Sequence, residues 1–138
     1  MRQASTRLGF RTSGPGLVEI TAEVADWVGG TGIATGLLTV LCRHTSASLC
    51  IQENAAPAAR RDLERWLARL APEDEAYEHD DEGPDDMPAH IRSALTQTQF
   101  SIPVQHGKPA LGTWQGVYLF EHRRDAPERQ IVLHLAGE

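Results

Sequence analysis

The sequence predicts one α+β domain whose strands are mostly antiparallel. A chain of 138 residues is long enough to bury a core but too short for two typical domains. No internal repeat or long low-complexity tract interrupts it, so residues 1–138 are expected to form a single unit. The element patterns follow the order strand, an optional short strand, helix, two strands, two helices and three strands, which is typical of the α+β class.

The first elements are a strand and a short amphipathic helix. Residues 4–12 have the composition of a strand, and "SGPG" (13–16) marks a turn. Thr21 is expected to cap the following helix, and Gly29 and Gly30 to end it. Four apolar residues recur at helical spacing and predict its buried face: Ile20, Val24, Trp27 and Val28.

Two strands and a longer helix come next. Residues 36–44 are apolar and β-branched as in a buried strand, and residues 48–53 alternate as a second one. The helix has Pro57 in its first turn and ends before Pro72. Its apolar stripe repeats at i, i+3, i+4 and i+7, through Leu63, Trp66, Leu67 and Leu70.

A third helical pattern lies in "DDMPAHIRSALTQ" (85–97). Asp85 or Asp86 is expected as its N-cap, with Pro88 in the first turn. Asp86 and His90 are four residues apart and therefore share one side of the helix. The predicted apolar face consists of Met87, Ile91, Ala94 and Leu95.

Three strands close the chain, at residues 100–104, 113–122 and 129–135. The segment between the first two, "HGKPALG", reads as a turn. Both faces of the 113–122 strand are largely apolar, which indicates either two packed layers or an oligomer interface. Gln115 and Glu121 share its inner face, where each needs a specific partner.

Charge is concentrated in one acidic segment. Residues 73–86 hold 9 of the 19 acidic residues and no Lys or Arg, so the rest of the chain has 13 basic against 10 acidic residues, a balance of +3. An acidic segment attracts cations and repels phosphates, and no basic stripe is present, so we expect no nucleic-acid partner.

Membrane and disulfide chemistry are not expected either. No segment approaches the roughly 20 apolar residues that span a bilayer. Cys42 and Cys50 lack the paired spacing of a zinc or redox motif. These features predict a cytoplasmic protein with no structural disulfide and no membrane partner.

The acidic segment has two interpretations from its residues alone. In the first, His79 and His90 converge on a divalent cation, with His44 or a carboxylate as third ligand and water in the open position. In the second, the segment is a solvated loop in which His90 merely pairs with Asp86. The eleven-residue spacing of the two histidines matches no compact zinc motif, so it permits a site without specifying one.

Two other positions carry candidate chemistry. His44 opens "HTSAS", whose hydroxyls can hold an anion or orient an imidazole, although such residues are also routine at strand ends. Glu53 points inward if its strand persists, where a carboxylate needs a cation or donors, and is otherwise solvated. Arg123 and Arg124 can bind phosphate or remain simply exposed.

Three strings together resemble the signature stretches of the YjbQ family of secondary thiamine-phosphate synthases: "HTSASLCIQENAAP" (44–57), "YEHDDEGPDDMPAH" (77–90) and "GKPALGTWQGVYLFEHR" (107–123). The resemblance covers nearly the whole chain. It implies two packed, mostly antiparallel β-sheets with flanking helices, assembled as a homotrimer. Cys50 and Gln52 depart from the family string "SLTINEN", and Cys50 is expected to be a small buried filler.

The resemblance also implies an enzyme, a transferase that joins a pyrimidine diphosphate to a thiazole phosphate and releases pyrophosphate. Its cofactor is expected to be a divalent metal, zinc, manganese or magnesium, and its partner a small phosphorylated metabolite. The expected metal ligands are His44, His79 and His90; the expected catalytic residues are Glu53, Asp86, Gln115 and Glu121; the expected phosphate contacts are Ser46, Ser48, Asp85 and Arg123. Two alternatives remain: a metal-dependent hydrolase or phosphatase, and a non-catalytic trimeric metal or metabolite binder.

Overall fold

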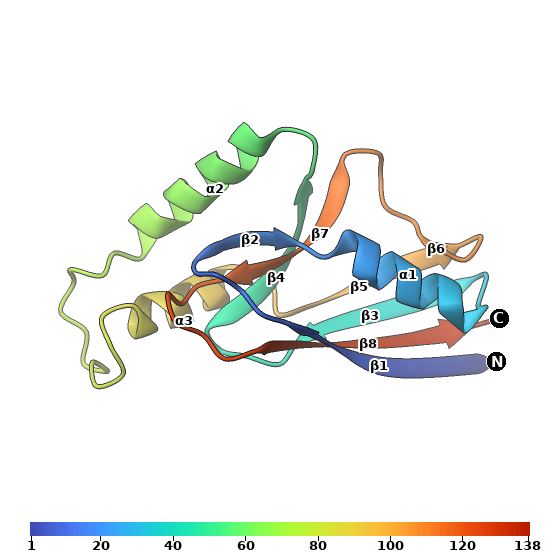
Figure 1. Cartoon of the computed structure of the whole chain (residues 1–138), viewed down its shortest axis with the longest axis horizontal. Coiled ribbons are helices and arrows are strands. Elements are labelled where there is room, and N and C mark those ends of the chain that lie inside the picture. The colour runs from blue at the N-terminus through green and yellow to red at the C-terminus, as the bar shows by residue number, and fades with distance from the viewer.

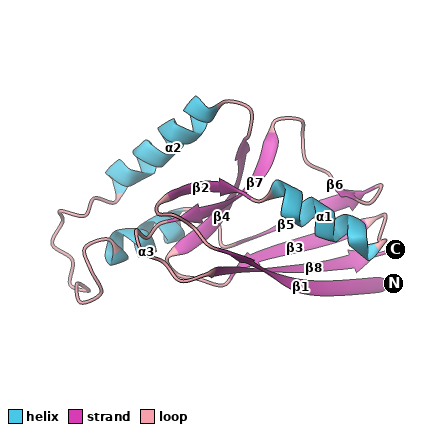
Figure 2. Cartoon of the chain, viewed as in Figure 1, coloured by secondary structure: helices cyan, strands magenta, loops and turns pink.

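The computed structural model describes residues 1–138 as two antiparallel sheets with three helices (Figures 1 and 2), which confirms the predicted α+β class. The larger sheet contains, in spatial order, β1 (Arg2–Phe10), β8 (Arg129–Gly137), β3 (Gly36–Cys42), β5 (Gln99–Gln105) and β6 (Lys108–Pro109). The smaller sheet contains β2 (Gly16–Glu19), β7 (Gln115–Glu121) and β4 (Ala47–Glu53). The helices are α1 (Thr21–Thr31), α2 (Pro57–Leu70) and α3 (Asp86–Leu95).

One core joins the two sheets and α1. It collects sixteen buried side chains, among them Val40 of β3, Leu119 of β7 and Leu133 of β8, all fully buried. Each such side chain contributes about 1.5–3 kcal/mol when it leaves water. The apolar runs 36–44 and 129–135 supply much of this core, because alternate residues of β3 and β8 point inward. No helix is long and apolar enough to cross a bilayer.

Helix α1 differs from its prediction at both ends. Ile20 occupies the N-cap position, and the Thr21 hydroxyl instead accepts the amide of Val117 at 2.9 Å, which ties the helix to β7. The helix continues through Gly29 and Gly30 to Thr31 and is capped by Gly32, whose φ of 74° lies in the left-handed region that glycine adopts without strain. The pair Gly29 and Gly30 therefore does not end the helix, whereas Gly32 does, because it adopts the left-handed conformation of a helix C-cap.

Helix α2 has the predicted bounds but a narrower buried face. Leu67 is buried in a small cluster with Leu17, Tyr118 and Phe120, against which Leu63 packs. The side chains of Trp66 and Leu70 are half exposed, at 53% and 48%. Only part of the predicted apolar stripe therefore meets the sheet. Cys50 packs against the same cluster, and burial raises its pKa to about 11, so it is a filler rather than a nucleophile.

The predicted apolar face of α3 is wrong. Ala94 and Leu95 are exposed, whereas the buried face carries Asp86, Ala89 and Ser93 at spacings of three and four. The Ser93 hydroxyl donates to the carbonyl of Ala47 at 3.0 Å, which fixes the helix on β4. Compared with the predicted orientation, α3 is therefore rotated about its own axis, and the polar side chains of Asp86 and Ser93 face the protein interior.

The long strand β7 is buried on both faces, as predicted, because the main core lies on one side and the α2 cluster on the other. The predicted turn "HGKPALG" contains the short strand β6, which forms a hairpin with β5 through His106 and Gly107, both at positive φ. The two chain termini lie beside each other at the end of the larger sheet, opposite α3 (Figure 1).

Candidate metal centre

Two imidazoles and a carboxylate converge where the acidic loop meets α3. Asp86 Oδ2 lies 3.0 Å from His79 Nε2 and 3.1 Å from His90 Nε2. The three possible ligand atoms all lie within 4.8 Å of one another. Asp86 and His90 come from successive turns of α3, and the loop reverses at Gly83, at φ 100°, to bring His79 back. We call His79, Asp86 and His90 the triad.

The hydrogen bonding of His90 fits a cation. Its Nδ1 lies 2.9 Å from the carbonyl oxygen of Thr45, which can only accept, so Nδ1 carries a proton. The Nε2 of a neutral His90 then presents a lone pair to Asp86 Oδ2, which is also a lone-pair donor. Such a contact requires a proton or a metal ion between the two atoms. An Nδ1–H bonded to a backbone carbonyl is also the usual support of a metal-ligating histidine.

Asp86 is buried, at 4% exposure, and its two oxygens face different partners. Oδ1 accepts a hydrogen bond from Arg123 Nη1 at 2.5 Å, so Oδ2 alone faces the two imidazoles. Next to it, Asp85 accepts from Arg123 Nε at 3.2 Å and from the Arg124 amide at 2.9 Å. Burial by itself would raise the pKa of Asp85, but these donors lower it below the ordinary value.

His79 forms the open side of the triad. Its side chain is 46% exposed, and its Nε2 also lies 2.9 Å from Glu82 Oε2. Desolvation acts to lower the pKa of His79, but the hydrogen bonds to Asp86 and Glu82 outweigh it and raise the pKa. A positive charge is therefore favoured at this ring when no metal occupies the triad.

A polar pocket of about 450 Å³ opens beside the triad, a volume in the range of small-molecule sites. Asp86, His90 and Arg123 form part of its wall, and His44 and Ser46 another part, so five of the predicted site residues share one cavity. The complete lining is Arg43, His44, Thr45, Ser46, Glu82, Asp86, His90, Arg123, Asp125, Pro127 and Arg129.

His44 lines this pocket but does not join the triad. Its Nε2 accepts the backbone amide of Gln130 at 2.9 Å, which leaves only Nδ1 for another partner. Burial and the nearby charge of Arg129 lower its pKa, so the ring is neutral. The structure therefore groups His79 and His90 with Asp86, rather than with His44.

Glu121 and Ser48 lie behind the pocket rather than in it. Glu121 is fully buried and pairs with the equally buried Arg129, whose Nε lies 2.8 Å from Oε1. Burial would raise the pKa of Glu121, but its hydrogen bonds, chiefly that from Arg129, lower it. Arg129 also donates to the Ser46 carbonyl and hydroxyl, each at 3.1 Å. Ser48 is bonded to His122 Nε2 at 2.8 Å and is buried.

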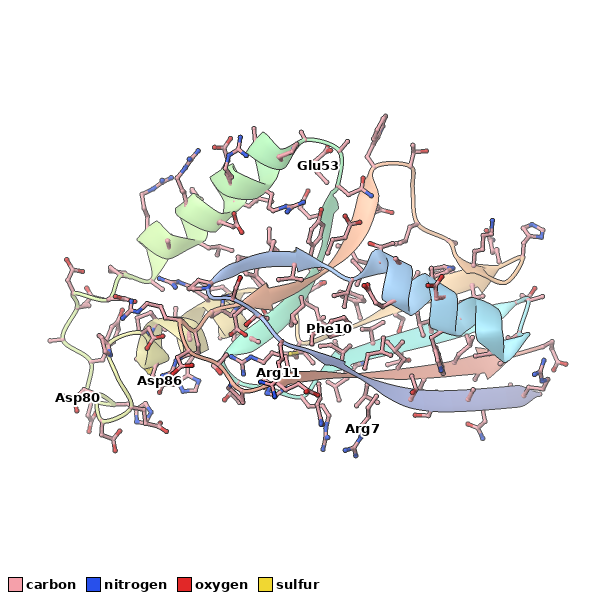
Figure 3. All side chains as sticks on the ribbon, in the orientation of Figure 1. Arg7, Phe10, Arg11, Glu53, Asp80 and Asp86 are labelled. Atoms are coloured by element: carbon pink, nitrogen blue, oxygen red, sulfur yellow. The ribbon has the colours of Figure 1, made fainter.

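Glu53 and Gln115 lie far from the triad within the chain. They face each other at one end of the β4–β7 pair, whereas Ala47 and Glu121 pair at the other, about 20 Å away at the rise of a strand. Glu53 accepts the amides of residues 55 and 56 at 2.8 and 3.0 Å, ahead of α2, and Gln115 accepts the Gly112 amide at 2.8 Å. Figure 3 shows Glu53 by the start of α2, remote from Asp86.

Sequence reasoning missed three contributors to the site. Glu82 is 60% exposed and still contacts His79, a role that nothing in the charge pattern of the loop indicates. Thr45 contributes through its backbone carbonyl, which has no side-chain signal. Arg129 begins the last strand and reaches the pocket only because β8 pairs with β3, a contact across almost ninety residues.

Comparison with known proteins identifies the family. The family model described as "UPF0047 protein YjbQ-like" matches residues 6–138. A UPF0047 protein of Synechocystis is 49% identical over 138 residues, which cover 99% of this chain and 94% of the relative. The YjbQ protein of Salmonella typhimurium is 47% identical over 120 residues, covering 86% of this chain and 87% of the relative.

Solved structures agree on the fold. A conserved hypothetical protein from Thermus thermophilus superposes with a TM-score of 0.85 at 33% identity, covering 95% of this chain and 99% of its own. None of these names states a reaction or a metal. Sequence and fold together place the chain in the YjbQ/UPF0047 family.

Proposed function

We propose that the triad binds a divalent cation through His79 Nε2, Asp86 Oδ2 and His90 Nε2, with water completing the coordination. The observation that carries this proposal is the placement of the His90 ring: Nδ1 lies 2.9 Å from the Thr45 carbonyl oxygen, and Nε2 faces a carboxylate oxygen at 3.1 Å. Two imidazoles with one carboxylate suit zinc or manganese better than magnesium, which prefers oxygen ligands.

The reaction we propose is the transfer implied by the family resemblance, thiamine-phosphate synthesis from a pyrimidine diphosphate and a thiazole phosphate. A cation in the triad would neutralise the diphosphate that leaves. The pocket beside it supplies the exposed Arg43 and the Ser46 hydroxyl for phosphate oxygens. Ser48, Asp85 and Glu121 are engaged in buried contacts, so we assign them to support of the site.

A metal-dependent hydrolase of another small phosphorylated metabolite is the second candidate. Three protein donors with an open position are typical of catalytic rather than structural zinc sites, since structural sites use four. A metal-bound water at neutral pH is a competent nucleophile. The polar pocket contains no glycine-rich phosphate loop, which is compatible with a weak synthase and equally with a different phosphorylated substrate.

Metal binding tests the common part of both functions. We expect the wild-type chain to bind Zn²⁺ or Mn²⁺ with one ion per chain in calorimetry, and His90→Ala or Asp86→Asn to weaken this at least tenfold. His106→Asn is the matched control, because His106 is exposed in the β5–β6 hairpin and asparagine readily adopts its φ of 53°. Unchanged metal affinity in His90→Ala would refute the site.

Turnover separates the candidates. Purified protein loaded with Zn²⁺ or Mn²⁺ is mixed with the two synthase substrates, and separately with a panel of phosphorylated metabolites. Chelator-sensitive release of pyrophosphate with thiamine phosphate supports the synthase, and chelator-sensitive release of phosphate from another compound supports the hydrolase. Stoichiometric binding without any turnover identifies the third alternative, a metal or metabolite binder.

We also propose a cytoplasmic homotrimer. The free thiols Cys42 and Cys50 suit a reducing compartment. One face of the larger sheet has no helix over it and exposes Leu37 and Leu41 at 50% and 37%. Apolar side chains in such a position favour burial against further copies of the chain.

A further inference from the structure

Arg123 holds together the parts of the chain that form the triad. Its Nη1 donates to Asp86 Oδ1 at 2.5 Å, its Nε to Asp85 Oδ2 at 3.2 Å, and its Nη2 to the Glu82 carbonyl at 2.9 Å. The side chain follows the end of β7 and is 22% exposed. One guanidinium thus links a strand, the start of α3 and the loop that carries His79.

We propose that Arg123 is a positioning residue that makes Asp86 a one-oxygen ligand. Its hydrogen bond occupies Oδ1 and fixes the plane of the carboxylate, so that only Oδ2 faces the cation. The inference rests on the proposed metal site and adds the reason for its geometry. This positioning role replaces the phosphate contact that the sequence predicted for Arg123, because three of its five N–H groups already donate to the protein.

The fork shape of the guanidinium is essential to this role. Nε and Nη1 reach the carboxylates of two consecutive residues, which a single ammonium group cannot reproduce. The backbone amide of the next residue, Arg124, supports Asp85 from the same side at 2.9 Å. Asp85 therefore connects Arg123 to the start of α3. This contact explains why Asp85 is buried although it does not line the pocket.

An electrostatic role and a positioning role of Arg123 predict opposite changes in metal affinity when its side chain is removed. Arg123 is a cation beside the proposed cation site, so its loss would strengthen metal binding if charge repulsion were its main effect. Loss of the hydrogen bond to Oδ1 instead frees the carboxylate to rotate, which weakens binding. Supports of this kind typically contribute 10- to 100-fold to metal affinity.

The first measurement is the affinity of Zn²⁺ for the full chain by competition with a chromophoric chelator. We expect Arg123→Ala and Arg123→Lys each to bind 10- to 100-fold more weakly than wild type. Arg124→Ala is the matched control, since Arg124 is the neighbouring arginine and its guanidinium pairs with Glu73 at the surface. We expect its affinity to stay within about twofold of wild type.

The second measurement is the visible spectrum of Co²⁺ in the same site. Freed from Arg123, Asp86 can bind with both oxygens, which raises the coordination number and weakens the d–d bands per bound cobalt. We expect this weakening in Arg123→Ala and no change in Arg124→Ala. A merely destabilised fold would lower the thermal midpoint without altering the spectrum of the protein that remains folded, and Arg123→Lys, which keeps the charge, provides a second folded variant.

The outcomes are distinct. Equal or tighter Zn²⁺ binding in Arg123→Ala, with an unchanged Co²⁺ spectrum, overturns the positioning role while the metal site stands. Full affinity in Arg123→Lys shows that a single ammonium group can replace the guanidinium, which overturns the role proposed for the fork of Nε and Nη1. Absence of binding by the wild-type chain refutes the proposed function itself, and the role of Arg123 with it.

Discussion

At the residue scale, His122 is a titratable group held in a buried environment. Its side chain is 1% exposed, its Nε2 is bonded to Ser48, and its Nδ1 has no partner in the protein. Burial, followed by the positive charge of Arg92, lowers its pKa to about 3. Protonation of this ring in the folded state is therefore unfavourable at all but strongly acidic pH.

We predict that His122 makes the fold sensitive to mild acid. In the unfolded chain the pKa of His122 is near 6.5, so between pH 6.5 and about 3 the ring binds a proton in the unfolded state but not in the folded state. The neutral, buried ring therefore contributes its full stability to the fold above pH 6.5, and this stability is lost as the pH falls. From pH 7 to pH 5 the free energy of unfolding should fall by about 2 kcal/mol more in wild type than in His122→Phe.

Urea unfolding at the two pH values measures this difference. Phenylalanine keeps an aromatic ring next to Phe120, whose centroid lies 4.5 Å from that of His122. His106→Asn, at an exposed position in the β5–β6 hairpin, controls for loss of a histidine as such. The same acid dependence in wild type and His122→Phe would contradict the assignment.

The buried pair of Glu121 and Arg129 gives a second prediction at this scale. Both side chains are at most 1% exposed, so Glu121→Gln leaves a buried cation without its charge partner. We expect a loss of about 3–5 kcal/mol in the free energy of unfolding by urea. The double variant Glu121→Leu/Arg129→Met should recover part of it, since an apolar pair leaves no unpaired charge. A double variant less stable than the single one would contradict this account.

At the element scale, α2 is held less firmly than the strands. Its contact with the smaller sheet depends on a four-residue cluster, whereas sixteen residues form the main core. We predict that its amides exchange through local opening of the helix rather than through global unfolding. Leu67→Ala should destabilise this packing by about 2 kcal/mol, at the low end for leucine, because Leu67 is at the edge of the cluster.

Native-state hydrogen exchange distinguishes the two kinds of opening. Leu67→Ala should accelerate exchange in α2 and leave β3 and β8 unchanged. Leu133→Ala, in the main core, is the contrasting variant and should accelerate exchange throughout the chain. Equal acceleration of α2 and β8 by Leu67→Ala would show that the helix opens only with the whole domain.

Element bounds were more predictable than element faces. Pro57 and Pro72 bracket α2 because proline tolerates a first helical turn and disrupts an interior one. The buried face of α3 was mispredicted because Asp86 is buried by a partner 37 residues later, Arg123, which no local pattern contains. Local signals placed the ends of α2 correctly and those of α1 to within one or two residues, while the orientation of a helix depends on contacts made in the folded protein.

The candidate site divides in the same way. His79, Asp86 and His90 lie within twelve residues, so their proximity was visible in the sequence. Glu53 and Gln115 were grouped with them because a resemblance between motifs says nothing about distances in space. In the structure, both residues lie at the end of the β4–β7 pair that is opposite the triad. Arg129 could not be anticipated, because its position depends on the pairing of β8 with β3.

At the scale of the whole molecule, the larger sheet has one covered and one uncovered face. The residues of β3 alternate, so Val40 enters the core while Leu37 and Leu41 point away from it. Their cross-strand neighbours extend the apolar character, through Pro103, Val132 and Ala136. Arg7, on the edge strand β1, is exposed and points outward (Figure 3), so the face has a charged margin.

This face is where the proposed trimer can be tested. Sedimentation velocity of the wild-type chain should give a mass three times the 15.2 kDa of one chain. Leu37→Glu places a charge in the uncovered apolar face, so burial against another copy would desolvate it and we expect smaller species. Leu95→Glu is the matched control, because Leu95 is similarly exposed, at 58%, but lies at the end of α3. A monomeric wild type, or a trimer indifferent to Leu37→Glu, would show that this face does not hold the subunits together.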